Sequence, residues 1–197
     1  METTLISTIY DVEPVMICIT KFSPKKVILL TEDNASEVIK QSEETLTNAF
    51  GRFIEIKSKE IDSNDSVKIA SAVATEIEEE KKFGNRIVVN ISGGERPQAL
   101  GALFGAYSKH QFVDRIIFVD YFKKEVVDLP ILKYGISNTK VDILRCLIEG
   151  CSTVKDLSTK IGISRGMTYN HIRELRDMGL INKELLEITT AGRLAIV

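Results

Sequence analysis

The stretch Arg86-Ile-Val-Val-Asn-Ile-Ser-Gly-Gly-Glu-Arg-Pro97 decides the fold of the first half of this chain. Residues 86–91 form a short, β-branched apolar run bounded by turn residues, which is typical of a buried strand. Residues 92–97 then form a turn, and Pro97 suits the first turn of a helix that is predicted to extend to about residue 110. A buried strand that passes through a glycine turn into a helix indicates an α/β fold.

The same alternation of strands and helices extends through the first 130 residues. Strands are predicted at residues 5–9, 26–31, 53–56, 86–91, 115–120 and 124–129, and helices at residues 12–22, 35–50, 66–83 and 97–110. Short apolar strands that alternate with helices form a parallel sheet with both faces covered. We therefore expect a Rossmann-like α/β domain with a parallel sheet over residues 1–130.

The pattern changes after residue 130. Residues 131–137 are predicted to be a linker, followed by helices at 138–149, 154–161 and 165–178, a hairpin at 180–188 and a terminal helix capped by Thr189 or Thr190. Gly162 ends one helix and Ser164 caps the next, which is the layout of a helix-turn-helix. Residues 138–197 are therefore predicted to be a small winged helix-turn-helix domain that binds DNA.

Composition and charge exclude several classes of protein. The 197 residues include 26 Lys and Arg and 28 Asp and Glu, a net charge of −2, which argues against a histone-like basic protein. The total divides into −4 over residues 1–137 and +2 over residues 138–197. Three cysteines without a Cys-x-x-Cys motif and two histidines predict neither a disulfide framework nor a metal site. Because the N-terminus has no basic leader and no apolar span, we expect a cytoplasmic protein with no membrane partner.

Two predicted loops leave the same edge of the sheet, where α/β proteins bind ligands. Amides at the start of the 97–110 helix, together with Arg96, could hold a phosphate, while Thr8 could form a hydrogen bond and Tyr10 could stack on a base. A tight turn without a ligand is an equally open interpretation, and the loop matches neither the dinucleotide-binding motif nor the P-loop. The candidate ligand-binding residues are Thr8, Ile9, Tyr10, Asp11, Ser92, Gly93, Gly94, Glu95, Arg96 and Pro97.

The predicted helix at 165–178 carries the candidate DNA contacts. Tyr169, Ile172 and Leu175 form an apolar stripe that is expected to pack inward, although Tyr169 is also kept as a candidate contact. In the major groove, arginine can form paired hydrogen bonds with guanine and asparagine with adenine. Ser164 and Thr168 can form hydrogen bonds with phosphate oxygens. A winged helix that binds protein instead of DNA stays open, because acidic residues accompany this helix. The candidate DNA-binding residues are Ser164, Arg165, Thr168, Tyr169, Asn170, His171, Arg173, Arg176 and Lys183.

The turn from Ser92 to Arg96 resembles the second signature loop of CRISPR-associated Rossmann-fold (CARF) domains, a Ser/Thr-Gly-Gly-x-Arg/Lys turn after the fourth strand. Thr8 stands where the first signature loop is expected, although the glycine that is frequent in that loop is absent. With its winged helix added, nearly the whole chain resembles the archaeal CARF-type transcription regulators of CRISPR loci.

The resemblance implies a homodimer whose paired CARF domains bind a cyclic oligoadenylate, with cyclic tetra-adenylate as the expected ligand and no cofactor. The implied function is transcription regulation of CRISPR-Cas loci in antiviral defence, in which the ligand alters binding to double-stranded promoter DNA. Two alternatives stay open: a ring nuclease that cleaves its own ligand, and an adaptor that binds protein through the winged helix. Neither loop holds a histidine or a pair of carboxylates, so no catalytic residue is predicted and we expect the protein not to be an enzyme.

Overall fold

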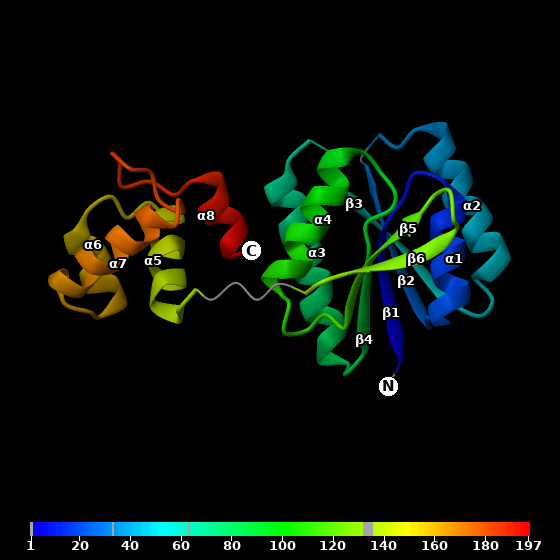
Figure 1. Ribbon diagram of the computed structural model, residues 1–197, viewed down its shortest axis with the longest axis horizontal. Helices are drawn as coiled ribbons and strands as arrows, with labels where there is room; N and C mark the ends of the chain where they lie inside the picture. Colours follow the sequence, from blue (N-terminus) through cyan, green and yellow to red (C-terminus); the bar gives the residue numbers. More distant parts are fainter. Residues whose placement is uncertain (1, 33, 63, 132–135) are drawn as a thin grey trace. The chain divides into compact units, whose positions relative to one another are not determined.

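The computed structural model describes residues 2–32, 34–62, 64–131 and 136–197 of the chain (Figure 1). The chain divides into two units, Met1–Lys133 and Tyr134–Val197, and each unit has its own hydrophobic core. Most of the predicted linker at 131–137 falls on residues 132–135 and lies outside the described residues. The domain bounds of 1–130 and 138–197 therefore stay a prediction.

The first unit is built on one six-stranded sheet. Its strands follow the order β3-β2-β1-β4-β5-β6, in which β1 to β5 are parallel and β6 is antiparallel to β5. The chain therefore extends the sheet to one side of β1 through β2 and β3, and then to the other side through β4, β5 and β6. The elements are β1 (Thr3–Thr8), α1 (Val12–Phe22), β2 (Lys26–Glu32), α2 (Glu37–Phe50), β3 (Glu55–Ile61), α3 (Ser66–Lys82), β4 (Arg86–Asn90), α4 (Arg96–Ser108), β5 (Arg115–Asp120) and β6 (Glu125–Leu129).

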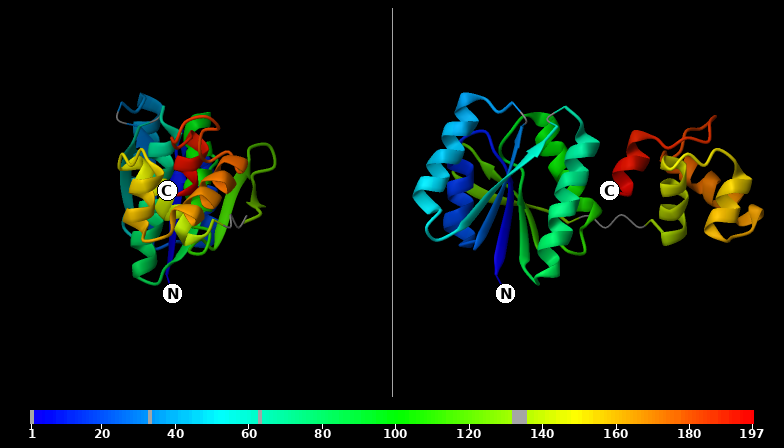
Figure 2. Two further views of the ribbon diagram at one scale, coloured as in Figure 1. Left: turned by 90° about the vertical axis from the view of Figure 1, so that its left-hand side faces the viewer. Right: turned by 180° about the vertical axis from the view of Figure 1, so that it is seen from behind.

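Helices cover both faces of this sheet (Figure 2). Successive residues of a strand point to opposite faces, so Leu5 belongs to one core cluster and Ile6 to the other. The cluster around Leu5 contains residues of α1 and α2, whereas the cluster around Ile6 contains residues of α3 and α4. The predicted Rossmann-like α/β fold is confirmed.

Two strands differ from their sequence-based predictions. β6 is antiparallel because only residues 121–124 connect it to β5, whereas a parallel crossover needs about a dozen residues. The third strand is predicted at residues 53–56 but lies at Glu55–Ile61, and Phe53 is exposed. Because β3 is an edge strand and most of its side chains are at least partly exposed, its sequence is largely polar and the apolar pattern is weak.

The second unit is helical, with a short hairpin before its last helix. Its helices are α5 (Asn138–Ile148), α6 (Val154–Ile161), α7 (Arg165–Asp177) and α8 (Thr190–Ala195). The hydroxyls of Thr153, Ser164 and Thr189 cap α6, α7 and α8, and Gly162 ends α6 in the left-handed conformation that favours glycine. The predicted helix-turn-helix is confirmed. Within the described ranges, no helix of either unit is long and apolar enough to cross a membrane.

The hairpin predicted at 180–188 is present and is small, as expected. A single bridge joins Ile181 to Ile188, and the Asn182 N–H donates to the Glu187 carbonyl at 2.9 Å. The Asn182 side chain closes the turn by accepting the Glu184 N–H at 2.9 Å. These side-chain hydrogen bonds to backbone N–H groups stand in place of the strand-to-strand hydrogen bonds of a longer wing.

Small residues let α4 lie directly against α3. A Cβ atom at Gly101 would lie 2.6 Å from the Cβ of Ile69, and one at Gly105 would lie 2.6 Å from the carbonyl oxygen of Ala70. The glycine face of α4 is therefore buried within the domain. This contact packs α4 against α3 on one face of the sheet.

A buried ion pair joins α3 to the amino edge of the sheet. Glu80, near the end of α3, is 3% exposed and pairs with Lys26 at the start of β2. Its carboxylate also accepts hydrogen bonds from Thr4 Oγ1 at 2.8 Å and Asn85 Nδ2 at 3.1 Å. Burial by itself would raise the pKa of Glu80, but the hydrogen bonds from Lys26, Thr4 and Asn85 hold that pKa below its ordinary value.

We predict that Glu80→Gln lowers the free energy of unfolding by about 3 kcal/mol at neutral pH, because Lys26 loses its charged partner. Since the pKa of Glu80 is depressed in the folded state, its contribution is present above the unfolded pKa of about 4.3 and is lost as pH falls through the folded pKa. Urea denaturation followed by circular dichroism should show the gap between wild type and variant closing below about pH 4.

The control for this prediction is Glu55→Gln, which removes the charge from an exposed pair with Lys57. It should cost less than about 1 kcal/mol. A gap between wild type and Glu80→Gln that stays constant on acidification would contradict the role assigned to the charge.

Candidate ligand site and nucleic-acid interface

The sheet order creates a switch point between β1 and β4. From β1 the chain enters α1 on one face of the sheet, and from β4 it enters α4 on the other face. The loops at residues 9–11 and 91–95 therefore follow the carboxyl ends of two adjacent strands and lead to opposite faces of the sheet (Figure 1). In open α/β sheets, ligands bind in the crevice at such a point.

The two loops are held together by Thr8 and Gly93. The Gly93 N–H donates to Thr8 Oγ1 at 3.0 Å, and the Thr8 hydroxyl lies 3.5 Å from the carbonyl oxygen of Asn90. A Cβ atom at Gly93 would lie 2.6 Å from the Thr8 carbonyl oxygen, so only glycine fits there. Thr8 is fully buried, which corrects the expectation that its hydroxyl meets a phosphate or sugar: it joins the loops instead.

Asn90 organises the turn that follows β4, and the candidate list above omits it. Its Oδ1 accepts from both the Ser92 N–H and the Ser92 hydroxyl, and its Nδ2 donates to Ser7 Oγ at 2.9 Å. Ser92 Oγ in turn accepts the Val119 N–H at 2.7 Å. The Ser92 hydroxyl is therefore occupied inside the domain, and its contact with a ligand stays a prediction. The signal for Asn90 was an amide side chain at the end of an otherwise apolar strand.

The other predicted ligand residues divide into interior and exposed groups. Ile9 is buried in the core. Asp11 caps α1, because its carboxylate accepts the Glu13 N–H at 2.9 Å. Both residues were predicted to contact a ligand. Tyr10 is 52% exposed, and Glu95 and Arg96 are exposed as well. The most exposed of the predicted ligand side chains at the switch point are therefore Tyr10, Glu95 and Arg96.

The start of α4 also presents backbone donors. Among the described residues, the N–H groups of Gly94 and Arg96 donate to no protein acceptor, and Pro97 has no N–H. The Glu95 N–H is occupied, because it donates to Gln98 Oε1 at 2.8 Å. Gln98 is fully buried, and its Nε2 has no hydrogen-bond partner within the described ranges. Two free amides at a helix N-terminus beside an exposed arginine can bind an anion such as phosphate.

A third loop reaches the same edge of the sheet. Residues 121–124 connect the carboxyl end of β5 to β6, and Lys124 forms an ion pair with Glu13 in the first turn of α1. Sequence reasoning did not select this loop, although two adjacent aromatic residues between two strands were visible in it. No group of three His, Cys, Asp or Glu side chains in the described parts of the chain could hold a metal ion.

The candidate nucleic-acid interface lies on α7, and its inward stripe differs from the prediction. Thr168, Ile172 and Leu175 are buried, whereas Tyr169 is 61% exposed. The Thr168 hydroxyl donates to the Ser164 carbonyl at 3.0 Å, so it is not available to DNA. The hydrogen bond of the Thr168 hydroxyl is formed within the helix, so Thr168 can be buried. It takes the inward position that the apolar pattern predicts for Tyr169.

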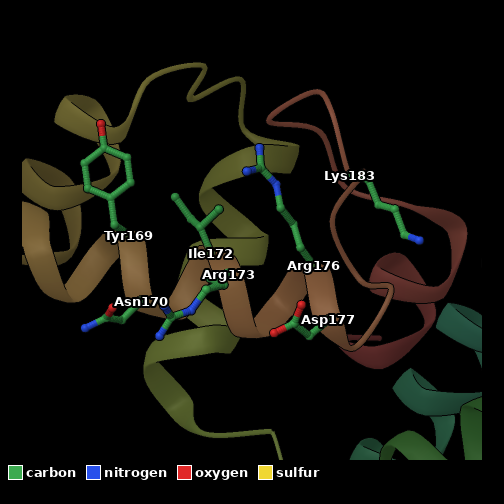
Figure 3. A pocket seen from close by; sticks show the side chains of 7 residues that line it. All are labelled: Tyr169, Asn170, Ile172, Arg173, Arg176, Asp177 and Lys183. Carbon is green, nitrogen blue, oxygen red and sulfur yellow. The ribbon is translucent and has the colours of Figure 1, made fainter.

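The exposed face of α7 borders a shallow cavity of about 670 Å³ (Figure 3). Asn170, Arg173 and Asp177 project from one side of the helix, and Arg176 projects from the other side, toward the turn that carries Lys183. Arg176 Nε donates to the Asn182 carbonyl at 3.1 Å, which holds its guanidinium beside that turn. The cavity is lined by Tyr169, Asn170, Ile172, Arg173, Arg176, Asp177 and Lys183.

Three further candidates lie outside this cavity. Ser164 caps α7 by accepting the Met167 N–H at 3.3 Å, and Arg165 in the first turn is exposed. His171 is partly covered, with its Nδ1 3.7 Å from a carboxylate oxygen of Glu174. The structure thus gathers Asn170, Arg173, Arg176 and Lys183, and it turns Thr168 inward.

Two known families match the chain, one for each unit. Residues 2–120, which are more than half of the chain, match the family described as "HFX_2341_N:-like, N-terminal". Residues 137–183 match "HTH_5: Bacterial regulatory protein, arsR family". Curated proteins show no sequence match.

Solved structures share the fold at low sequence identity. Protein VC1899 from Vibrio cholerae aligns with a TM-score of 0.54 and 15% identity, over 98% of this chain and 63% of its own. Csm6 from Enterococcus italicus, bound to cyclic hexa-2'-fluoro-hexa-dAMP, aligns with a TM-score of 0.55 and 15% identity, over 90% of this chain and 52% of its own. The chain thus spans less than two thirds of either protein, and the likeness establishes the fold alone.

We predict that Gly93→Ala lowers the free energy of unfolding of the first unit by about 1–3 kcal/mol, because the added methyl group meets backbone atoms that cannot move aside. Gly166→Ala is the matched control, since a Cβ there has no neighbour closer than 4.0 Å and alanine favours a helix. Thermal and urea unfolding of both variants test the prediction. A Gly93→Ala protein as stable as the wild type would show that the close approach to Thr8 is not needed.

Proposed function

Because this chain belongs to the HFX_2341_N-like family through a CARF-like N-terminal domain, and carries an ArsR-family helix-turn-helix domain, we propose that it is a DNA-binding regulator that senses a cyclic oligoadenylate. The first unit is the sensor and the second unit binds DNA. The ligand acts by changing the affinity of the protein for its operator.

The observation that carries the DNA-binding part is the exposed face of α7. A helix-turn-helix places its second helix in the major groove, where arginine and asparagine read base edges. Asn170 and Arg173 lie on that helix and are exposed. Neither Arg173 nor Lys183 has an acidic partner within the described residues, so both charges are free to meet phosphates or bases.

The sensor part is supported by the groups at the start of α4. The free amides of Gly94 and Arg96 and the exposed Arg96 side chain suit a phosphate of the ligand. The domain as a whole is acidic, at −4 over residues 1–137, so these local donors must outweigh the overall field. Amides directed at a phosphate act at contact distance, where they outweigh distant screened charges.

The finer form of the proposal follows the family resemblance. Two copies of the chain would present the same pair of loops to one ring, which suits a ligand with two-fold symmetry such as cyclic tetra-adenylate. The ligand in the Csm6 structure is a ring of six nucleotides, so rings of four and of six nucleotides both belong in any test. The operator would be double-stranded promoter DNA of a CRISPR locus.

Cleavage of the bound ring gains no support from these loops. A ring nuclease must place polar groups around the 2′-hydroxyl that attacks the neighbouring phosphate. The hydroxyls of Thr8 and Ser92, two of the candidates, are held in hydrogen bonds inside the domain. We therefore infer that these two hydroxyls do not take part in cleavage, and we propose a regulator.

We predict that Arg173→Ala weakens binding to operator DNA by about 5- to 150-fold, because a base contact of this kind contributes about 1–3 kcal/mol. Fluorescence anisotropy with the promoter DNA beside the protein's own gene, measured at several salt concentrations, gives the affinity and its salt dependence. Arg52→Ala, an exposed arginine of the first unit, is the control and should change neither. Equal affinity of the wild type for promoter and unrelated DNA would count against a regulator.

We predict that cyclic tetra-adenylate changes the operator affinity by about 5- to 150-fold, and that the operator changes the ligand affinity by the same factor. Calorimetry with and without DNA measures both sides of this linkage, and cyclic hexa-adenylate tests the ring size. Arg96→Ala should weaken ligand binding and so shift the response to higher ligand concentration. An operator affinity that neither ring alters would overturn the sensing role.

A further inference from the structure

The turn between β5 and β6 stands at the same edge of the sheet as the two candidate ligand loops. β5 pairs in parallel with β4, so the two strands end side by side (Figure 1). Ser92 in the glycine turn accepts the Val119 N–H near the end of β5, and Lys124 in the β5–β6 turn pairs with Glu13 at the start of α1. We call residues 121–124 the hairpin tip; it follows the strand that is bonded to the glycine turn, and it pairs with the first turn of α1.

The hairpin tip carries two exposed aromatic side chains. Tyr121 is 62% exposed and Phe122 is 93% exposed, and their rings meet edge to face with centroids 6.0 Å apart. Tyr10, on the neighbouring loop after β1, is half-exposed too. The exposed phenylalanines Phe53 and Phe83 instead precede β3 and β4 and so lie at the opposite, amino edge.

The hairpin tip is held in one shape by its own hydrogen bonds. The Asp120 carboxylate accepts the Phe122 N–H at 2.9 Å and the Lys123 N–H at 3.0 Å. The Lys124 ammonium lies 4.0 Å from the centroid of the Tyr121 ring, while its ion pair with α1 anchors the other end of the turn. A turn whose backbone is held in this way loses little conformational freedom when it binds a partner.

The charges of the hairpin tip suit an anionic partner with flat apolar groups. The Lys123 ammonium is exposed and forms no salt bridge within the described residues, although the Asp120 carboxylate at the base of the turn attracts it. Aromatic rings stack on nucleobases, each contact contributing about 1–3 kcal/mol, and nearby cations meet the phosphates. A nucleotide offers both groups, a flat base and an adjacent phosphate.

We propose that the hairpin tip is a base-stacking element of the sensor, in which Phe122, supported by Tyr121, stacks on a base of the ligand whose phosphate lies at the start of α4. Lys123 faces an adjacent phosphate. The inference rests on the proposed function and adds to it the residues that read the base. The occupant is a nucleobase; a second copy of the chain is the competing outcome of the test.

The experiment measures the affinities of full-length wild type, Phe122→Ala, Phe122→Leu and Phe122→Trp for cyclic tetra- and hexa-adenylate by calorimetry. Removing the ring should weaken binding about 5- to 150-fold in the alanine variant. The leucine variant, which keeps apolar bulk without a ring, should also bind weakly, and the tryptophan variant should bind as the wild type does. Phe83→Ala, which removes a phenylalanine that is 77% exposed at the opposite edge, should leave the affinity unchanged.

Native mass spectrometry and circular dichroism of the same proteins separate the outcomes. Loss of affinity in Phe122→Ala and Phe122→Leu, with the same subunit number and melting temperature as the wild type, supports the proposal. Unchanged affinity in both variants overturns the stacking role alone and leaves the sensor intact. A loss of affinity that follows a loss of dimer overturns it in favour of a contact between copies. A wild type that binds neither ring overturns the proposed sensing function, and the stacking role with it.

Discussion

The candidate ligand site depends on the close approach of Gly93 to the end of β1. The Thr8 hydroxyl accepts the Gly93 N–H, and the Thr8 carbonyl lies where any side chain at Gly93 would have to go. Asn90 and Ser92 extend this contact to Ser7 on β1 and to the end of β5. One hydrogen-bond network thus joins the ends of three adjacent strands, β1, β4 and β5. This network holds the turn that leads into α4.

The binding sites that we propose for the two units would recognise negative charge by different physical means. The sensor unit is acidic overall and offers amides at a helix N-terminus, whose partial charges act only at short range. The DNA-binding unit offers whole charges on Arg173 and Lys183, which also act at longer range and attract a polyanion before contact. A net charge of −2 for the whole chain is therefore compatible with two separate surfaces that we propose to bind anions.

Elements that bury an apolar face were predictable from sequence, and elements that do not were less so. The bounds of α1 and β5 agree with their predictions, because alternating or helical burial leaves a strong period in the sequence. β3 was misplaced because an edge strand needs few apolar residues. On α7, Thr168 was misassigned because a threonine that bonds to its own helix can be buried without adding to the hydrophobic pattern.

The sequence by itself determined the fold class, the glycine turn after β4 and the helix-turn-helix, because each depends on residues close together in the chain. Only the tertiary structure decided which groups of those motifs are free to bind. Thr8 and Gly93 are 85 positions apart, and Ser92 and Val119 are 27 apart. Local sequence carries no record of such partners, so it could not show that two hydroxyls are used inside the domain. Nor could it show that an aromatic turn after β5 stands beside them, because strand order alone brings these segments to one edge.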